Sequence, residues 1–259
     1  MEVAALPDRR DGSGRPGKRL VHRRSPRVSV VVPTLNEEGN LPGVIARLPD
    51  GLHELIVVDG RSSDSTVAVA RELYPAVRVV EQRRRGKGDA LALGFAAATG
   101  DVVVTVDGDG STDPAEIPRF VAALTAGADM AKGSRFLGDG GSDDLTPTRR
   151  AGARALTWLV NLLFGTRFTD LCYGYTAFWR DRLDRIRVAD GFEVEASMSV
   201  SAARAGLTVI EVPSYELARV HGTSNLRTVR DGLRVVGAIL GERARRRPQA
   251  APDPVRAAG

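Results

Sequence analysis

The stretch that decides the fold is Val102-Val-Val-Thr-Val-Asp107-Gly-Asp109-Gly-Ser111-Thr-Asp113, a β-branched apolar run that ends in closely spaced carboxylates. Such a run predicts a strand buried on both faces of a parallel sheet, and α/β sheets bind ligands at the carboxyl ends of their strands. Asp107 and Asp109 would repel each other there without a cation between them. Carboxylate oxygens suit Mg²⁺ or Mn²⁺, and a bound divalent ion favours a diphosphate. We therefore expect a metal-assisted site for a nucleotide-linked substrate.

Two simpler interpretations of this stretch compete with a metal site. A calcium-binding EF-hand loop requires Gly at its sixth position and Glu at its twelfth, and counting from Asp107 these positions hold Thr112 and Pro118. The pattern therefore disfavours an EF-hand. The other interpretation is a plain turn, in which Gly108 and Gly110 supply positive φ angles and the acids are solvated.

Strands and helices alternate along the rest of the chain. The apolar runs predict strands at 28–32, 55–58, 77–80, 102–106, 129–132, 175–180 and 208–212. The intervening patterns predict helices that end at 48, 73, 98, 164, 205 and 240. This alternation predicts an α/β fold, with a parallel sheet and right-handed crossovers. Because three early strands end at Pro33, Asp59 and Asp107, we expect polar side chains to converge on one edge, which disfavours the plain turn.

The basic residues gather at the two ends of the chain. The 259 residues are 42% apolar and carry a net charge of +5, which fits one compact domain with loose ends. Residues 1–27 and 242–259 together carry +8, so residues 28–241 carry −3. We interpret 1–27 and 242–259 as disordered basic tails around a catalytic domain at 28–241. A nucleic-acid enzyme would carry a basic stripe on its folded face, so we expect no nucleic-acid partner.

Cysteine usage and hydropathy suggest the compartment. Cys172 is the single cysteine, so no intramolecular disulfide can form, which fits a reducing cytoplasm. No stretch has the ~18 apolar residues of a membrane span. The predicted helix at 149–164 nevertheless ends in two almost wholly apolar turns, and the predicted helix at 226–240 is basic and amphipathic. We expect a cytoplasmic protein, with a peripheral position on the inner face of the membrane as an option.

Six short motifs occur in a fixed order between residues 28 and 235. They are Pro33-Thr34-Leu-Asn36-Glu37, Val58-Asp59-Gly60 followed by Ser63 and Thr66, Gly86-Lys87-Gly88, Asp107-Gly108-Asp109, Gly133-Ser134-Arg135 and Gly222-Thr-Ser224-Asn225-Leu226. This series resembles the family 2 glycosyltransferases, and within them the dolichyl/polyprenyl-phosphate mannose and glucose synthases. The resemblance implies an α/β, GT-A type fold, with a mostly parallel, Rossmann-like sheet flanked by helices. It also implies a nucleotide-sugar half at 28–132 and an acceptor half at 133–241.

The resemblance also implies roles for single residues. The positions that match the donor-binding residues of the family are Pro33, Thr34, Asn36, Glu37, Asp59, Lys87, Asp107, Gly108 and Asp109. Among these, Asp107 and Asp109 would hold Mg²⁺ or Mn²⁺ on the diphosphate of a GDP-, UDP- or dTDP-linked sugar. Three positions depart from the usual pattern of the lipid-phosphate group: Gly60 replaces a second Asp, Ser111 a Gln and Asn225 a Lys.

The chemistry of the acceptor decides which further residues are needed. A phosphate acceptor is already ionised at pH 7 and needs cations, whereas an alcohol must lose a proton to a base. The candidates for binding an acceptor or its phosphate are Arg135, Arg149, Arg150, Glu193, Arg219, His221 and Ser224. The candidates for a base are Asp170 and the pair Glu193 and Glu195. We expect the catalytic residues to be Asp107, Asp109, Asp170 and Arg135.

The sequence as a whole favours an inverting, metal-dependent hexosyltransferase that moves a sugar from a nucleoside-diphosphate sugar to a polyprenyl phosphate. One alternative is transfer to a soluble hydroxyl acceptor, with Asp170 or Glu193 as the base. Another is a nucleotide-sugar binding module that has lost turnover. A nucleotidyltransferase is disfavoured because such enzymes usually carry a Gly-rich, basic segment after the first strand, where this chain has Pro33-Thr-Leu-Asn-Glu37.

Overall fold

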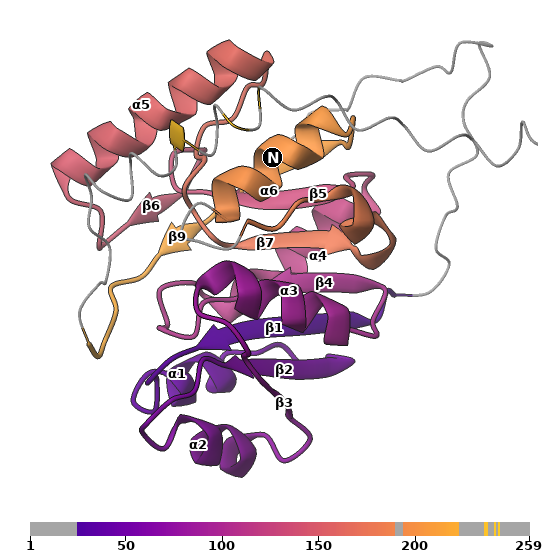
Figure 1. The fold of residues 1–259 in the computed structure, drawn as a ribbon, viewed down its shortest axis with the longest axis vertical. Helices are drawn as coiled ribbons and strands as arrows, with labels where there is room; N and C mark the ends of the chain where they lie inside the picture. The colour runs from indigo at the N-terminus through magenta and orange to yellow at the C-terminus, as the bar shows by residue number, and fades with distance from the viewer. Residues whose placement is uncertain (1–24, 190–193, 223–235, 238–240, 242, 244–259) are drawn as a thin grey trace, which may run out of the picture.

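A seven-stranded sheet forms the centre of the molecule. The computed structural model describes residues 25–189, 194–222, 236–237, 241 and 243. The strands are ordered β3-β2-β1-β4-β7-β5-β8 (Figure 1). Their bounds are β1 (Val28–Thr34), β2 (Glu54–Asp59), β3 (Arg78–Glu81), β4 (Val102–Thr105), β5 (Met130–Ser134), β7 (Thr176–Trp179) and β8 (Val209–Pro213). Of these seven, only β7 runs antiparallel to its neighbours. The predicted α/β fold with a mostly parallel sheet is confirmed.

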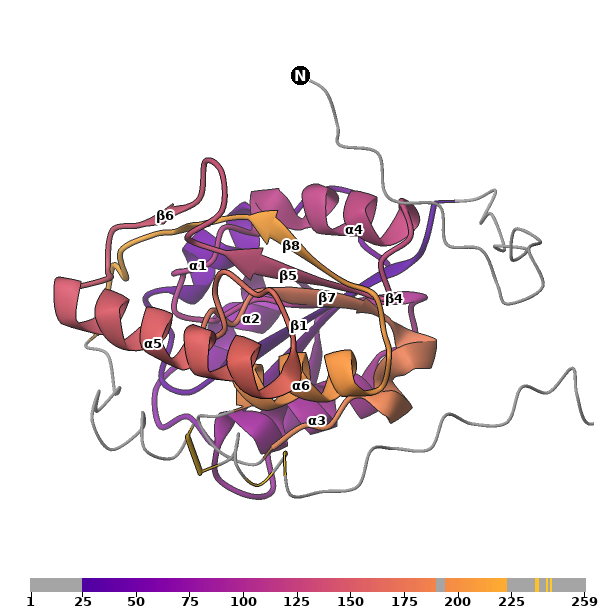
Figure 2. The same ribbon diagram turned by 90° about the horizontal axis from the view of Figure 1, so that it is seen from above.

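Helices cover both faces of this sheet (Figure 2). The helices α1 (Leu41–Ala46), α2 (Thr66–Leu73) and α4 (Ile117–Thr125) pack on one face, and α3 (Lys87–Ala97) and α6 (Val194–Arg204) on the other. Successive residues of a strand point to opposite faces of the sheet. Val30 and Val32 therefore pack in the core that includes α1, α2 and α4, and Val31 packs in the core that includes α3 and α6. Helix α5 (Pro147–Phe164) packs outside α6.

Four smaller elements accompany the main sheet and its helices. The short strands β6 (Gly141–Ser142) and β9 (Tyr215–Glu216) pair with each other in a second, two-stranded sheet. The 3₁₀ helices η1 (Pro114–Glu116) and η2 (Arg180–Arg185) follow β4 and β7. The two-stranded sheet lies beyond the carboxyl ends of β1 and β4, on the side where the polar motifs are found (Figure 1).

The first strand continues past Pro33, where the sequence predicted its end. The carbonyl of Val31 accepts a hydrogen bond from the Val106 N–H, so the backbone of Val31 points toward β4. Two residues later Pro33 points the same way, but the pairing of β1 with β4 has already ended at Thr105. Pro33 has no N–H, but this breaks no hydrogen bond of the sheet because β4 no longer pairs with β1 at this point. Pro33 and Thr34 pair in register with β2 alone.

Other boundaries also differ from the prediction. Helix α1 is shorter than predicted, and α4 lies in a stretch for which the pattern predicted no element. The division expected between residues 132 and 133 falls inside the continuous strand β5, so the two halves share one sheet. Arg27 was assigned to the tail, yet its carbonyl accepts hydrogen bonds from the N–H groups of Asp101 and Val102 and its guanidinium pairs with Asp101.

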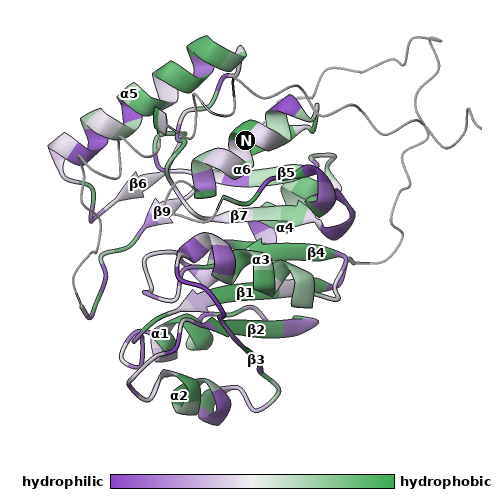
Figure 3. Ribbon diagram, in the orientation of Figure 1, coloured by the Kyte–Doolittle hydropathy of each residue, from purple (hydrophilic) through white to green (hydrophobic). Residues whose placement is uncertain are grey.

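Helix α5 begins and ends as its sequence dictates. The Thr146 side chain accepts a hydrogen bond from the Arg149 N–H, Pro147 occupies the first turn, and Gly165 ends the helix with a φ of 66°. Its buried face packs on α6 through Val160. Figure 3 shows that α5 is hydrophilic toward its N-terminus and hydrophobic toward its C-terminus.

Several predicted features lie outside the described residues. These are most of the final helix at 226–240 and the chain ends at 1–24 and 244–259, so their predicted helicity and disorder stay predictions. In the part of the chain that the structure describes, no helix is both long enough and apolar enough to cross a membrane.

We predict that Gly94→Ala destabilises the protein although alanine is the better helix former. A Cβ at Gly94 would lie 2.3 Å from Val31 Cγ1 and 3.1 Å from Val58 Cγ2, so α3 would have to move away from the sheet. We expect a loss of about 1–3 kcal/mol in the free energy of unfolding, measured in urea. Gly152→Ala in α5, where no atom lies within 4 Å of the new Cβ, is the matched control and should gain up to about 1 kcal/mol. Equal effects of the two substitutions would contradict the close packing of α3.

Candidate active site

The ends of three parallel strands bring the polar motifs together. β1 ends at Thr34, β2 at Asp59 and β4 just before the Asp107 loop, all at one edge of the sheet. A Cβ at Gly108 would lie 2.8 Å from the carbonyl oxygen of Pro33 and 2.8 Å from Thr34 Cγ2. Only glycine therefore lets the Asp107 loop pack this closely on the end of β1. The convergence expected from the sequence is present.

Asp107 belongs to a compact ionic cluster. The Lys87 Nζ atom, at the start of α3, lies 2.6 Å from Asp107 Oδ1 and 2.7 Å from Oε1 of Glu195 in the first turn of α6. A Cβ at Gly174 would lie 3.0–3.2 Å from the charged atoms of all three side chains. Glycine at 174 thus allows the main chain before β7 to approach the cluster.

Asp109 is oriented by its own loop and by a cation from a distant segment. Its Oδ1 accepts a hydrogen bond from the Ser111 N–H at 2.9 Å, and its carboxylate pairs with the Arg219 guanidinium. The Asp107 N–H donates to Thr112 Oγ1 at 3.0 Å. Ser111, which replaces the usual Gln, therefore contributes its backbone to the position of Asp109.

The surroundings shift the charges of these groups in different directions. Burial, together with the negative charges of Asp109 and Glu195, raises the pKa of Asp107 even though Lys87 opposes the shift. Burial alone would raise the pKa of Asp109 too, but the hydrogen bonds from Ser111 and the charge of Arg219 lower it. Burial disfavours the ammonium of Lys87, yet the two carboxylates it contacts raise its pKa. Lys87 is therefore a permanent cation between two carboxylates.

The loop after β1 forms the second part of the site. The Glu37 carboxylate accepts a hydrogen bond from Asn40 Nδ2 at 2.7 Å. Burial and the negative charges of Asp109 and Asp107 raise the pKa of Glu37. Asn36 has a φ of 58°, and its Oδ1 accepts from the Ser63 N–H at 2.8 Å. Asp59 accepts two hydrogen bonds from Ser62. Asn36 and Asp59 thus fix the geometry of two neighbouring loops.

The segment 217–222 connects the loop that carries Asp107 and Asp109 (residues 107–113, called the metal loop below) to this second part. The Leu217 N–H donates to the Ser111 carbonyl at 2.8 Å, and Arg219 pairs with Asp109 two residues later. The His221 N–H donates to Asn40 Oδ1 at 3.0 Å, and Asn40 Nδ2 donates back to the His221 carbonyl at 3.1 Å. His221 therefore lies beside the Glu37 loop.

Other predicted residues lie away from this cluster. Arg135 and Asp170 form a buried pair with each other, and the Asp170 side chain has no exposed surface. Arg149 pairs with Asp144, and the Arg150 guanidinium lies 5.8 Å from the centre of the Phe136 ring. Glu193 and Ser224 fall outside the described residues.

The burial of Asp170 argues against the base role expected from the sequence. Its carboxylate accepts a two-pronged hydrogen bond from Arg135, which leaves it no route to an acceptor hydroxyl. The sequence analysis gave Glu195 only as the second member of the pair with Glu193, yet it is Glu195 that contacts Lys87 in the cluster. The signal in the sequence is that Glu195 is the single charged residue in the run from Val194 to Ala202, whose other residues are all buried in the helix.

The composition of the cluster fits a divalent cation. Asp107, Asp109, Glu195 and Glu37 supply four negative charges, and Lys87 and Arg219 return two positive ones. No group of three or more His, Cys, Asp or Glu side chains in the described residues is placed to hold a metal by itself. A two-carboxylate site suits Mg²⁺ or Mn²⁺, which takes its remaining ligands from water and phosphate oxygens.

Comparison with known proteins agrees with this geometry. The sequence model described as Glycosyl transferase family 2 matches residues 29–187. The chain belongs to glycosyl transferase family 2. The predicted membership is thereby confirmed, and the wide, mostly parallel sheet is the GT-A type fold of this family.

Family members of several kinds are similar to this chain. Glycosyltransferase AglJ of Haloferax volcanii is 32% identical over 209 residues, which are 79% of this chain and 68% of that protein. A polyprenol monophosphomannose synthase of Mycolicibacterium smegmatis is 33% identical over 219 residues, 79% of this chain and 82% of that protein. The expected resemblance to the polyprenyl-phosphate group is confirmed.

A solved structure of similar fold carries the ligands expected of the family. It is a glucosyl-3-phosphoglycerate synthase of Mycobacterium tuberculosis in complex with Mn²⁺, uridine diphosphate and glucosyl-3-phosphoglycerate. It is 28% identical with a TM-score of 0.68, and the match covers 83% of this chain and 79% of that one. Divalent metal and a nucleotide thus occur together on this fold.

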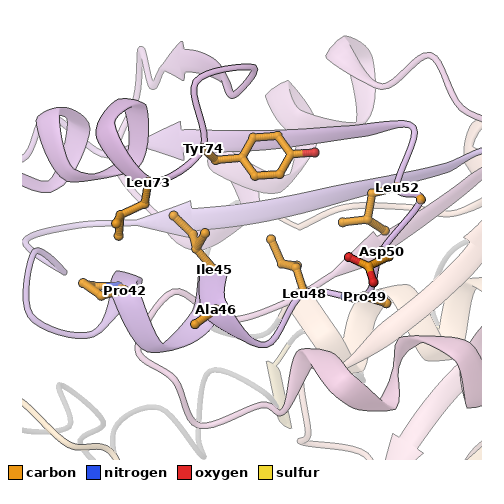
Figure 4. A pocket seen from close by; sticks show the side chains of 10 residues that line it. Pro42, Ile45, Ala46, Leu48, Pro49, Asp50, Leu52, Leu73 and Tyr74 are labelled. Carbon is orange, nitrogen blue, oxygen red and sulfur yellow. The ribbon is translucent and has the colours of Figure 1, made fainter.

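A separate groove lies between α1 and the end of α2 (Figure 4). Its lining is mainly apolar and includes Pro42, Ile45, Leu48, Leu52, Leu73 and Tyr74. Asp50 is the single charged side chain among the lining residues. A groove without a lining cation does not suit a diphosphate.

We predict that Lys87→Met makes stability depend on pH. Without Nζ, Asp107 stays partly buried beside Asp109 and Glu195, and its folded-state pKa rises further above the unfolded value. Such a group stabilises the fold at low pH, and this contribution disappears as the pH rises through the folded-state pKa. Relative to wild type, the variant should lose about 1–3 kcal/mol at pH 8 and less at pH 5, measured by unfolding in EDTA.

Lys87→Arg keeps the positive charge and is the matched control for this experiment. It should show the pH dependence of the wild type, with at most a uniform loss caused by the larger head group. A loss in Lys87→Met that is the same at pH 5 and pH 8 would show that Lys87 does not compensate the carboxylates.

Proposed function

We propose that the protein is an inverting, metal-dependent hexosyltransferase that transfers a sugar from a nucleoside-diphosphate sugar to a polyprenyl phosphate. The observation that carries the acceptor assignment is the surface of α5. This helix combines guanidinium groups near its start with exposed large apolar side chains further along. The similarity to a polyprenol monophosphomannose synthase supports the same acceptor class.

The donor would lie along the carboxyl ends of the first strands. Pro33, Thr34, Asn36, Glu37 and Asp59 would surround the nucleoside, as expected from the motifs. Asp107 and Asp109 would hold Mg²⁺ or Mn²⁺ on the diphosphate. When bound, that ion would act as a Lewis acid that stabilises the negative charge on the departing diphosphate.

The two cations of the cluster, Lys87 and Arg219, would help to stabilise the negative charge on the departing diphosphate. Lys87 and Arg219 each pair with a metal-loop carboxylate in this structure. In the enzyme loaded with metal and donor, both side chains could turn their donors from these carboxylates toward phosphate oxygens. Each would then stabilise the leaving nucleoside diphosphate most strongly as the bond to the sugar breaks.

A phosphate acceptor removes the need for a general base. One of its ionised oxygens attacks the anomeric carbon from the face opposite the diphosphate, the carbon–oxygen bond to the donor breaks, and the configuration inverts. Glu195, held by Lys87 at 2.7 Å, is then available to orient a sugar hydroxyl. The burial of Asp170 is consistent with a reaction that uses no base at that position.

The acceptor phosphate would bind at the start of α5. The guanidinium groups of Arg150 and Arg154 lie 5.8 Å and 5.2 Å from the centre of the Phe136 ring. The guanidinium of Arg135 is 5.8 Å from the same ring and 5.1 Å from that of Tyr173. Tyr173 precedes Gly174, which contacts the Lys87 cluster, so a continuous set of contacts joins Phe136 to the donor site.

The lipid chain would extend along the same helix. Trp158 and Leu162 are 65% and 64% exposed and lie one turn apart, so they form a continuous apolar surface. Large exposed apolar groups beside cations suit an amphipathic surface that rests on an anionic membrane. We therefore place the enzyme peripherally at the cytoplasmic face of a membrane.

A soluble hydroxyl acceptor is the second candidate. It is favoured by the similarity to glucosyl-3-phosphoglycerate synthase, whose complex contains a soluble phosphorylated product. Within the described residues Glu195 is the carboxylate best placed to serve as a base in that reaction, since Asp170 is enclosed.

Extraction of a labelled product decides between the two acceptors. We expect label from a nucleoside-diphosphate hexose to enter an organic-soluble polyprenyl phosphate. The double variant Trp158→Ala/Leu162→Ala should raise the KM for a long-chain acceptor about tenfold, since burying a large apolar side chain contributes roughly 1.5–3 kcal/mol. A short, water-soluble prenyl phosphate should react equally well with both proteins. Leu73→Ala, which removes an exposed leucine from α2, is the matched control. Label found only in water-soluble product would support the second candidate.

A metal-binding test separates an enzyme from a binding module without turnover. Mn²⁺ with UDP, GDP or dTDP at about 100 times the Kd should stabilise the wild type by about 2.7 kcal/mol, and the nucleotide that does so names the donor. Asp109→Asn should abolish this stabilisation and lower turnover at least about 100-fold. Asp113→Asn, in the same loop but bonded to the Ala115 N–H, should retain both. Stabilisation of the wild type without turnover on any acceptor would indicate the binding module.

A further inference from the structure

A buried ionic triad lies between the metal loop and α5. The Arg135 guanidinium holds Asp170 through two hydrogen bonds, Nε to Oδ2 at 2.7 Å and Nη2 to Oδ1 at 3.1 Å. Its third nitrogen, Nη1, donates to Glu216 Oε2 at 3.0 Å. The three residues are between 0% and 8% exposed. Such a fork fixes the relative orientation of its partners, and losing one partner would leave a buried charge without compensation.

The triad joins three segments that are distant in the sequence. Arg135 follows β5, Asp170 precedes β7 and Glu216 ends β9. Glu216 Oε2 also accepts a hydrogen bond from Ser142 Oγ at 2.5 Å, and the Glu216 carbonyl accepts from the Asp143 N–H at 2.9 Å. The β6–β9 sheet has only two residues in each strand, and so small a sheet is marginal by itself. Beyond its own pairing the sheet is anchored by the Ser214 N–H, which donates to the Ser134 carbonyl at 3.0 Å, and by side chains that include the buried triad.

Strand β9 in turn holds the metal loop. Glu216 forms an isolated β-bridge with Thr112, and the next N–H, that of Leu217, donates to the Ser111 carbonyl at 2.8 Å. The Ser111 N–H donates to the Asp109 carboxylate, and Thr112 Oγ1 accepts a hydrogen bond from the backbone N–H of Asp107. Hydrogen bonds and backbone pairings therefore connect the triad to the Asp109 carboxylate and to the backbone of Asp107.

We propose that Asp170, Arg135 and Glu216 are positioning residues that set the place of Asp107 and Asp109 through β9. This inference rests on the proposed function only in taking Asp107 and Asp109 as the metal ligands. Asp170 thereby acts on the site without touching substrate, which replaces the catalytic role that the sequence suggested for it. The role of Arg135 is likewise to hold Asp170 and Glu216, since three of its nitrogens are committed to them.

The test compares Asp170→Asn with Asp129→Asn. Asp129 also pairs with an arginine, Arg182, and accepts a backbone hydrogen bond from Thr208, but it lies at the opposite edge of the sheet. Hydrogen–deuterium exchange of metal-free protein should be at least about fivefold faster in Asp170→Asn for peptides covering 107–113 and 215–219. The matched control should leave both peptides unchanged. This readout needs neither metal, donor nor acceptor, so it stands even if the proposed reaction is wrong.

A second readout concerns metal affinity. Binding of Mn²⁺ in the presence of a nucleoside diphosphate should weaken at least about fivefold in Asp170→Asn, while kcat at saturating Mn²⁺ changes less than threefold. Glu216→Gln, which is closer to the metal loop, should show the same pattern and serves if Asp170→Asn does not fold. Unchanged exchange at 107–113 and unchanged Mn²⁺ affinity in the folded variants would overturn the proposal. A kcat loss above 100-fold with normal Mn²⁺ affinity would also overturn it, because that is the signature of a base.

Discussion

The constraint on which the rest of the structure depends is the concentration of negative charge at the carboxyl edge of the sheet. Asp107, Asp109 and Glu195 lie together there because β4 and α6 both end or begin at that edge. Lys87 and Arg219 compensate them only in part. A net negative, half-buried pocket is costly to a fold unless a cation joins it, and such a charge distribution suits a divalent ion.

The main chain around this edge packs closely on the charged side chains and orients them. Gly108 and Gly174 allow two stretches of main chain to approach the cluster, where a side chain would collide with neighbouring atoms. Backbone N–H groups, such as that of Ser111, then orient the carboxylates. The outer helix α5 differs from these elements, because it carries guanidinium groups near its start and exposed apolar side chains further along.

The sequence predicted the sheet and the convergence of its polar strand ends, because buried β-branched runs and the rules for parallel sheets are local and strong signals. It could not show that Asp170 is enclosed, since nothing local indicates that Arg135, 35 residues away, binds it. It gave Glu195 too little weight because the approach of α6 to Lys87 is a tertiary contact. The small strands β6 and β9 were unpredicted for a similar reason, as two-residue strands carry no periodicity.

The most direct measurement is a crystal structure of the protein with Mn²⁺ and the nucleoside diphosphate that binds it. The account predicts that the ion is coordinated by Asp107 and Asp109 together with the diphosphate, and that Lys87 and Arg219 have moved their donors toward phosphate oxygens. An ion or diphosphate bound elsewhere, with both aspartates still paired to Lys87 and Arg219 as they are here, would contradict it.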